Sequence, residues 1–222
     1  MKTINKLRLL LSNGARVNAA DADGFTPLHE AARGHPEVAE LLLSHDAHVN
    51  AVDDCGMTPL IYAAAVGRVI EVLVEHGADV NAVDSYNRAA LHCLACKGRE
   101  RSAELLIANG ADVTLADSRG WTPLHYAAGT ATPAGRPPVV GLLLQHGAQI
   151  EARDKEGKTP LICATSCRDA YGVEILLENG ATVDVADTFE ETTPLDTALD
   201  GAYFGVADLL IRHGALIDNK EL

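Results

Sequence analysis

The sequence predicts an all-α repeat solenoid, in which pairs of short helices stack one behind another along the chain. Three observations lead to this fold class. A nine-residue motif, GWTPLHYAA from Gly120 to Ala128, is present in six recognisable copies, with its proline position spaced by 31 to 37 residues. A second apolar run follows each copy, and apolar residues make up 47% of the chain while aromatic residues make up only 4%. One such unit cannot cover its own apolar faces, so the core must form between stacked neighbours.

Each unit reads as a helix, a short loop, a second helix and a projecting loop. Thr122 is suited to cap the first helix with its hydroxyl, and Pro123 to take the first helical position, where its missing N–H is no loss. The small pair Ala127 and Ala128 allows a neighbouring helix to approach closely. The second apolar run, VVGLLLQHG, ends at Gly147, the residue type that best tolerates the left-handed turn at a helix C-terminus.

The repeats predict a single array over residues 1–222. Residues 1–20 match only the back half of a unit, and we expect them to form a capping helix whose outer face is made polar by Lys6. Each full repeat begins at an aspartate, which we expect to bind backbone N–H groups of the turn. The six full repeats are expected at residues 21–52, 53–83, 84–116, 117–153, 154–186 and 187–222.

Two repeats depart from the common pattern. In the repeat of residues 84–116, Asn87, Ala89 and Ala90 replace the usual Gly, Thr and Pro. This removes a capping hydroxyl commonly worth about 1 kcal/mol, so we expect this repeat to be the least stable one.

The next repeat has a Gly- and Pro-rich insertion over residues 129–138, which is either a tolerated surface loop or a side contact. The array stops without a polar terminal helix, which fits either a fragment or a further cap beyond it.

The T-P-L-H-x-A signature at a period of about 33 residues resembles the ankyrin repeat family, and the resemblance covers the chain from end to end. It implies a concave face, formed by the projecting turns and the exposed edge of each first helix, on which a partner protein binds. In the last repeat the matching turn positions are Phe189 and Glu191. Elsewhere the match gives the candidate protein-binding residues Phe25, Arg33, Cys55, Met57, Tyr86, Arg88, Lys97, Arg119, Trp121 and Lys158.

Four of these residues, Phe25, Met57, Arg88 and Trp121, occupy one position in four consecutive repeats. They are of the types that anchor interfaces, and Trp121 is the only tryptophan in the sequence. Two interpretations stay open. The four side chains either pack on the neighbouring turn or form a partner groove between Phe25 and Trp121.

The resemblance also implies roles for a histidine column and an asparagine column. The histidines of the motif, His29, His92 and His125, are expected to hydrogen-bond backbone groups near the turn. Ankyrin repeats are frequent substrates of an asparaginyl hydroxylase, for which the candidate acceptors, in order of match, are Asn81, Asn50 and Asn18.

The sequence contains no catalytic motif, so we predict no enzymatic activity and no cofactor. The stretch HEAAR from His29 has Arg33 where a zinc hydrolase needs a second histidine. Cysteine pairs occur at 93 and 96 and at 163 and 167, but a whole repeat separates them, which is too far for one zinc ion. No metal site is therefore expected.

Charge and hydropathy restrict the partners and the compartment. The net charge of -13 and the sequence pI of about 5.0 weigh against binding to nucleic acid or to an anionic membrane. No apolar run approaches the roughly 20 residues of a membrane span, and no signal peptide is recognisable. We expect a cytoplasmic or nuclear protein that is not secreted, a setting that suits five cysteines.

The leading functional prediction is a monomeric, non-enzymatic scaffold or adaptor that presents a pre-ordered surface to another protein. The alternative is that the array is the regulatory or targeting portion of a larger multidomain enzyme, ubiquitin-ligase adaptor or channel. A third possibility is self-association through oppositely charged ends. Residues 1–20 carry four basic and no acidic side chains, whereas residues 187–222 carry eight acidic and two basic ones.

Overall fold

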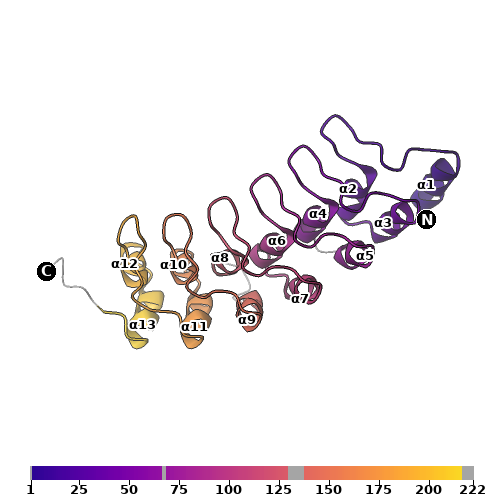
Figure 1. The fold of residues 1–222 in the computed structure, drawn as a ribbon. Helices are drawn as coiled ribbons and strands as arrows, with labels where there is room; N and C mark the ends of the chain where they lie inside the picture. Colours follow the sequence, from indigo (N-terminus) through magenta and orange to yellow (C-terminus); the bar gives the residue numbers. More distant parts are fainter. Residues whose placement is uncertain (1, 67–68, 130–137, 217–222) are drawn as a thin grey trace. The chain divides into compact units, whose positions relative to one another are not determined.

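The protein, in a computed structural model that describes residues 2–66, 69–129 and 138–216, is built from consecutive pairs of short helices (Figure 1). The expected insertion over residues 129–138 lies almost wholly outside the described residues, as does the segment 217–222. No strand occurs in the described ranges, where one isolated antiparallel bridge joins Val83 to Ala89. The prediction of an all-α repeat fold is confirmed.

The first helix of each pair begins at the motif proline, or at the alanine that replaces it, and the second helix is six to nine residues long. A single helix, α1 (Lys2–Ser12), precedes the pairs. The pairs are α2 (Pro27–Ala32) with α3 (Pro36–Leu43), α4 (Pro59–Val66) with α5 (Ile70–Glu75), α6 (Ala90–Cys96) with α7 (Glu100–Ala108), α8 (Pro123–Ala128) with α9 (Pro138–Gln145), α10 (Pro160–Ser166) with α11 (Ala170–Glu178), and α12 (Pro194–Asp200) with α13 (Phe204–Arg212).

Backbone contacts divide the chain into two compact units. Unit 1 comprises residues 1–94 and 101–112, and unit 2 comprises residues 95–100 and 113–222. Within unit 1, α2 packs against α4, α3 packs against α5, and α1 packs against α3. Within unit 2, α8, α10 and α12 form one row and α9, α11 and α13 form a second (Figure 1). Each unit therefore has a layer of first helices and a layer of second helices, as the stacking of repeats requires.

The start of a first helix is fixed by a threonine and a histidine acting together. Thr26 has an extended backbone, and both its N–H and its hydroxyl lie within hydrogen-bond distance of His29 Nδ1, at 3.0 and 2.9 Å. Pro27 follows at the first helical position. The small side chains of Ala31 and Ala32 are buried, which permits the close packing of α2 on α4. The sequence motif thus encodes both the cap and the helix contact.

The second helices end in a left-handed residue. Gly77, Gly110 and Gly147 have φ between 81° and 87° after α5, α7 and α9. Asp46 takes the same conformation after α3, with φ of 64°, although L-residues other than glycine adopt it at a cost. Its neighbour Ala47 then donates its N–H to the carbonyl of Leu42 at 3.0 Å, which closes the helix end.

The outer face of α1 is only partly polar, which corrects the expectation of a polar cap. Lys6 is exposed as expected, and so is Arg8. Leu9 and Leu10 are also exposed, by 63% and 49%. The reason is the run of three leucines, which is longer than the stripe that α3 can cover in an 11-residue helix.

Candidate functional site

The projecting turns share one backbone frame, which is built on the aspartate that opens each repeat. In the turn that precedes α4, Asp53 Oδ1 accepts hydrogen bonds from the backbone N–H groups of Cys55 and Met57, both at 2.9 Å. The Asp53 N–H in turn donates to the Met57 carbonyl at 3.1 Å. The expected Asx role is confirmed, because the same pair of bonds to Oδ1 recurs at Asp21, Asp84, Asp117 and Asp154.

The second carboxylate oxygen of two turn aspartates is bound by a tyrosine of the following helix. The Tyr62 hydroxyl donates to Asp53 Oδ2 at 2.8 Å, and the Tyr126 hydroxyl to Asp117 Oδ2 at 2.9 Å. Burial alone would raise the pKa of both carboxyls, but these bonds and the backbone N–H bonds outweigh it and lower the pKa overall. Burial and the bond to Asp53 raise the pKa of Tyr62 to about 12. Both turns are therefore held by an ionised carboxylate.

We call the fourth residue after each turn aspartate the neck residue; the neck residues of the first five turns are Phe25, Met57, Arg88, Trp121 and Lys158. Arg88 donates from Nε and Nη2 to Asp84 Oδ2, at 2.8 and 2.7 Å, and the Asp84 side chain is only 1% exposed. Trp121 donates its indole N–H to Asp154 Oδ2 of the next turn at 2.9 Å. Both neck residues hold turns in place, which favours the packing interpretation of this column.

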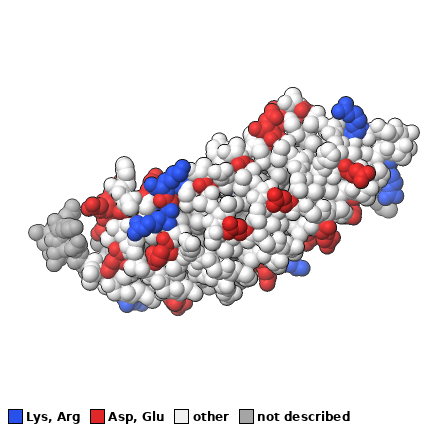
Figure 2. All heavy atoms as spheres, viewed as in Figure 1, with Lys and Arg blue, Asp and Glu red and all other residues white. Residues whose placement is uncertain are grey.

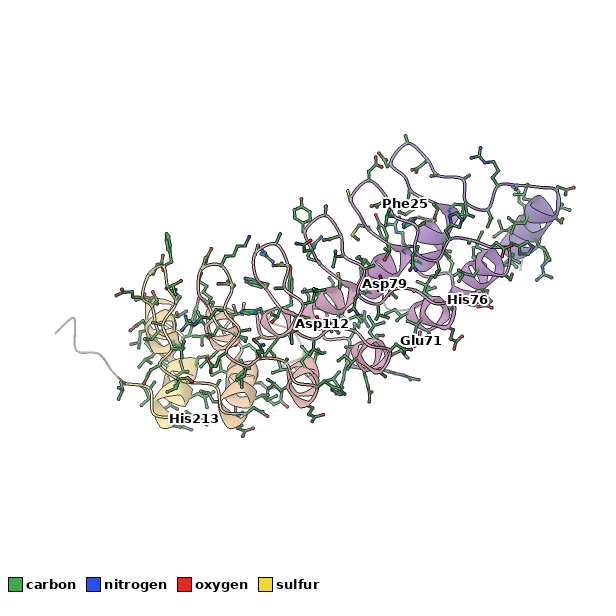
Figure 3. The ribbon with its side chains drawn as sticks, viewed as in Figure 1. Phe25, Glu71, His76, Asp79, Asp112 and His213 are labelled. Atoms are coloured by element: carbon green, nitrogen blue, oxygen red, sulfur yellow. The ribbon has the colours of Figure 1, made fainter. Side chains whose placement is uncertain are left out.

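The first two neck residues also make internal contacts, Phe25 through its ring and Met57 through its backbone carbonyl. Phe25 lies where the first turn meets α2 (Figure 3), and its ring centroid is 5.1 Å from that of His29 and 5.2 Å from that of Tyr62. The Met57 carbonyl lies 3.0 Å from His29 Nε2. Both side chains are half-buried. Binding of a partner by the neck column stays a prediction, and the structure gives its members internal contacts.

The motif histidines join each turn to its own helix and to the next turn. His125 Nδ1 accepts from the Thr122 N–H at 3.2 Å, and Nε2 lies 3.1 Å from the Lys158 carbonyl of the following turn. His29 is placed in the same way, and His92 Nδ1 accepts from the Ala89 N–H at 3.0 Å. Burial lowers the pKa of His29 and His125, so both rings are neutral in the fold. The expected backbone role of all three is confirmed.

The last turn contains one extra residue, which corrects the predicted register of its side chains. The Asp187 N–H donates to the carbonyl of Thr192, five residues on, whereas the Asp154 N–H donates to Lys158, four residues on. Glu191 has φ of 54° and occupies the place that glycine holds in other turns. Thr192, not Glu191, therefore takes the neck position. Counting back from the motif proline instead of from the aspartate reveals the insertion in the sequence.

Consecutive turns are tied to one another through their backbones. We call the second residue after each turn aspartate the tip residue, and at Asp23, Cys55, Arg119 and Glu156 its carbonyl accepts a backbone N–H of the next turn. In unit 1 the Asp54 N–H donates to the carbonyl of the tip residue Asp23 at 3.0 Å. In unit 2 the Lys155 N–H donates to the carbonyl of the tip residue Arg119, also at 3.0 Å. The backbone spacing between these neighbouring tips is thus fixed.

The tip side chains are all exposed, and the six are of different residue types. Tyr86 is 61% exposed and Phe189 82% exposed, the highest fraction among the large apolar side chains of the described residues. Arg119 is exposed while its guanidinium lies over the Trp121 ring, 4.5 Å from the centroid. The six tip residues are Asp23, Cys55, Tyr86, Arg119, Glu156 and Phe189.

The remaining predicted residues lie near the ends of first helices or in a turn. Arg33 follows α2, is exposed, and forms an ion pair with Glu30 at 3.2 Å. Lys97 follows α6 and is exposed. Lys158 is half-buried and pairs with the tip residue Glu156 at 2.8 Å, which raises the pKa of the lysine. The structure places these residues at the edge of the helix layers and at the turns, as predicted, and leaves their binding role untested.

The three candidate hydroxylation sites join the loops of consecutive repeats in unit 1. Asn81 Nδ2 donates to the Gly110 carbonyl at 2.9 Å, while its Oδ1 accepts the Asp112 N–H at 2.8 Å. Asn50 Oδ1 accepts the Asp79 N–H at 2.8 Å in the same manner, and Asn18 repeats the arrangement with Asp46 and His48. Asp79 and Asp112 mark two of these loops in Figure 3. The asparagines therefore have a structural role, whether or not they are modified.

The cysteines, the acidic residues and the histidines do not gather into a metal site in the part of the chain that is described. No group of three or more His, Cys, Asp or Glu side chains in those ranges could hold a metal ion. Cys163 is buried, and burial raises the pKa of its thiol to about 12, whereas Cys55 is exposed in a turn. Cys167 donates from Sγ to the Gly129 carbonyl at 2.8 Å. None of the described helices is long and apolar enough to cross a membrane.

Comparison with protein families places the repeats in a known class. The family model described as an ankyrin repeat matches residues 23–54. The model described as ankyrin repeats in three copies matches overlapping stretches, which are residues 48–117, 83–154, 104–187 and 131–221. Together these matches extend over nearly all of the sequence. A search of curated proteins finds no match.

Proposed function

Because the chain belongs to the ankyrin repeat family, we propose that it is a non-enzymatic scaffold or adaptor that binds a partner protein through its projecting turns. Ankyrin repeats are generally protein–protein interaction modules. The proposal assigns direct partner contact to the tip residues, with the neck residues beneath them as support. Arg33 and Lys97, the exposed residues that follow α2 and α6, are proposed as additional contacts to the partner.

One observation carries this proposal: a constant frame presents different side chains. Five turn aspartates make the same two bonds from Oδ1 to the backbone, yet the tip positions hold acidic, thiol, aromatic and basic side chains. Packing does not require this variety, because the tip side chains are exposed. A surface whose backbone is fixed while its side chains differ is suited to recognition of one particular partner.

The fixed frame also favours binding energetically. Ordering a flexible loop on association costs free energy, and a turn that is already ordered avoids most of that cost. The bonds from Asp54 to Asp23 and from Lys155 to Arg119 hold neighbouring tips in place before a partner arrives. Aromatic and arginine tips, such as Tyr86 and Arg119, are the residue types that contribute most to interface free energy.

The experiment compares tip variants with matched variants on the second helices. Tyr86→Ser and Phe189→Ser are combined in one protein, and Glu104→Ala and Glu174→Ala, which replace exposed side chains on α7 and α11, are combined in a control. Each protein is used to capture partners from cell extract, and the captured partner is then purified and titrated. Both variants should melt at the temperature of the original protein, because none of the four side chains is buried.

We expect the tip variant to bind the purified partner at least tenfold more weakly, and the second-helix variant to bind it unchanged. Equal affinity of both variants, or loss confined to the second-helix variant, contradicts the assignment of the surface. If the cell extract yields no protein that binds the purified chain, the scaffold function itself is contradicted. Sedimentation velocity at low and high salt tests the proposed monomeric state, since association through charged ends would decline with salt.

Two further proposals concern the setting of the protein. We propose residence in the cytosol or nucleus, which fluorescence microscopy of the tagged protein tests. Asn81 is proposed as the preferred site of hydroxylation. Its side-chain bonds to Gly110 and Asp112 must open for an enzyme to reach it. An added oxygen on the Asn81 peptide, seen by mass spectrometry and absent after Asn81→Gln, is the expected result; an unmodified peptide from the native source contradicts it.

A further inference from the structure

Unit 2 holds a surface pocket between two consecutive turns, one before α8 and one before α10. The pocket has a volume of about 310 Å³. Its lining includes Arg119 and Trp121 from the first turn and Asp154, Lys155, Glu156 and Lys158 from the second. The pocket lining thus includes one aromatic side chain, one arginine and two lysines, although the net charge of the protein is -13.

The guanidinium of Arg119 is held ready for an anion. It lies 4.5 Å above the Trp121 ring centroid and donates from Nη2 to the Tyr126 hydroxyl at 2.8 Å. Its Nε lies 3.4 Å from Asp117 Oδ2. The side chain is nevertheless 59% exposed, and Nη1 makes no hydrogen bond within the described part of the chain. A planar, pre-ordered guanidinium with free N–H groups is well matched to a carboxylate.

The carboxylates that line the pocket are bound or paired, whereas Lys155 is exposed without an ion-pair partner among the described residues. Lys155 is exposed, and its ammonium forms no ion pair with any described residue. The carboxylate of Asp154 is used internally, by the N–H groups of Glu156 and Lys158 and by the indole of Trp121. Glu156 remains as the one outward carboxylate of this lining, and it is paired with Lys158.

The surrounding surface makes this local arrangement unusual. Figure 2 shows Lys and Arg side chains grouped near the turns that precede α8 and α10, with acidic side chains beside them and elsewhere on the visible face. At physiological ionic strength the screening length is about 8 Å, so an approaching segment responds to the charges within reach and far less to the net charge of the chain. The local cations therefore decide which charge the pocket attracts.

We propose that this pocket binds an acidic, extended segment of the partner protein. One carboxylate of the segment pairs with Arg119 through Nη1, and a second carboxylate pairs with Lys155, so that the segment lies beside Trp121 in the pocket. This inference rests on the proposed scaffold function and adds the chemistry of the partner. Phe189 and Tyr86, the other large tips, are not needed for it.

Trp121 makes a direct test possible, because the only tryptophan of the chain lines the pocket. The probe is a synthetic peptide of alternating Glu and Ala residues, titrated into the intact chain while tryptophan emission is recorded. A peptide with Gln in place of every Glu is the matched control. We expect a saturable change of emission with the Glu peptide, an affinity that falls with added salt, and no saturable change with the Gln peptide.

The variants separate the pocket from the net charge of the protein. Lys155→Glu should weaken Glu-peptide binding at least tenfold, since it replaces an attraction by a repulsion at an exposed position. Arg8→Glu makes the same change of charge on α1, in unit 1, and should leave the affinity unchanged. Melting curves of both variants confirm that they are folded.

Three results overturn the proposal. They are equal binding of the Glu and Gln peptides, equal weakening by Lys155→Glu and Arg8→Glu, and tighter binding of a matched phosphoserine peptide, which would make the site one for phosphate. If these occur while the Tyr86→Ser, Phe189→Ser protein still loses its purified partner, the scaffold function stands and only the acidic-segment assignment fails.

Discussion

Replacing Asp117 by alanine should destabilise unit 2 far more than the equivalent replacement of Asp21 destabilises unit 1. The Asp117 side chain is 2% exposed. Its Oδ1 lies 2.7 Å from the Arg119 N–H nitrogen and 2.9 Å from that of Trp121, and its Oδ2 lies 2.9 Å from the Tyr126 hydroxyl. Alanine leaves all three donors without their acceptor in a place that water reaches poorly.

The magnitude follows from the kind of bond that is lost. A hydrogen bond to a charged group contributes about 1.5 to 3 kcal/mol, and relaxation recovers part of the loss, so we expect Asp117→Ala to cost about 3 kcal/mol. Asp21 makes the same two backbone bonds, but it is exposed, and water can replace its oxygens. Asp21→Ala should cost about 1 kcal/mol. Asp117→Asn keeps an acceptor for the backbone and should lie between the two.

The assay is urea-induced unfolding, followed by far-ultraviolet circular dichroism for the whole chain and by Trp121 fluorescence for unit 2. Two probes are needed because repeat arrays can unfold in parts. The fluorescence transition of Asp117→Ala should shift to lower urea, with that of Asp21→Ala little changed. Equal losses at the two positions, or a loss below about 1 kcal/mol at Asp117, would refute the view that the buried carboxylate holds the turn.

Three further predictions concern pH, glycine geometry and local stability. Because the pKa values of His29 and His125 are lowered, the folded state binds fewer protons than the unfolded state, and the free energy of unfolding should fall as pH drops below about 6.5. The lowered pKa values of Asp53 and Asp117 should add a second loss of stability below about pH 4. A free energy of unfolding that stays constant from about pH 7 to about pH 5 in urea titrations contradicts the histidine prediction. Gly110→Ala and Gly120→Ala both place a Cβ at positive φ, which costs about 1 kcal/mol. The Cβ of Gly120→Ala would also lie 3.0 Å from the backbone of Asp154 and Lys155, so this variant should lose about 1 to 2 kcal/mol more stability in thermal unfolding. Equal losses in the two variants would show that the turns are not closely apposed. Amide protection in residues 84–116 should be about fivefold lower than in the neighbouring repeats, as expected from a missing cap, and hydrogen exchange that is slower there than in residues 53–83 contradicts this.

Much of the fold could be predicted because its local signals agree. The motif proline marks the start of α2, α4, α8, α10 and α12, and the period of about 33 residues identifies the stack. The motif also encodes contacts that reach across repeats, since His29 and His125 each meet the carbonyl of the following turn. Such contacts are regular, so a recurring residue type suffices to predict them.

The candidate site was harder to predict because exposure depends on partners that differ from turn to turn. The neck position holds types that often anchor interfaces, yet Arg88 is bound to its own turn aspartate and Trp121 to the next one. Nothing in the residue types distinguishes these internal bonds from contacts to a partner. Lys155 shows the opposite difficulty: it precedes a tip, and the sequence does not distinguish it from other surface charges until the pocket beside Trp121 is seen.

The most direct test of the account is photo-crosslinking from single positions in the intact chain. A photoreactive amino acid is placed in turn at the exposed tip positions 55, 86 and 189, and at positions 104, 174 and 208 on the exposed sides of α7, α11 and α13. The account predicts that the tip positions crosslink one common partner protein and that the second-helix positions do not. Crosslinks that arise only from the second helices would contradict it, because the fixed turns would then support the fold without serving recognition.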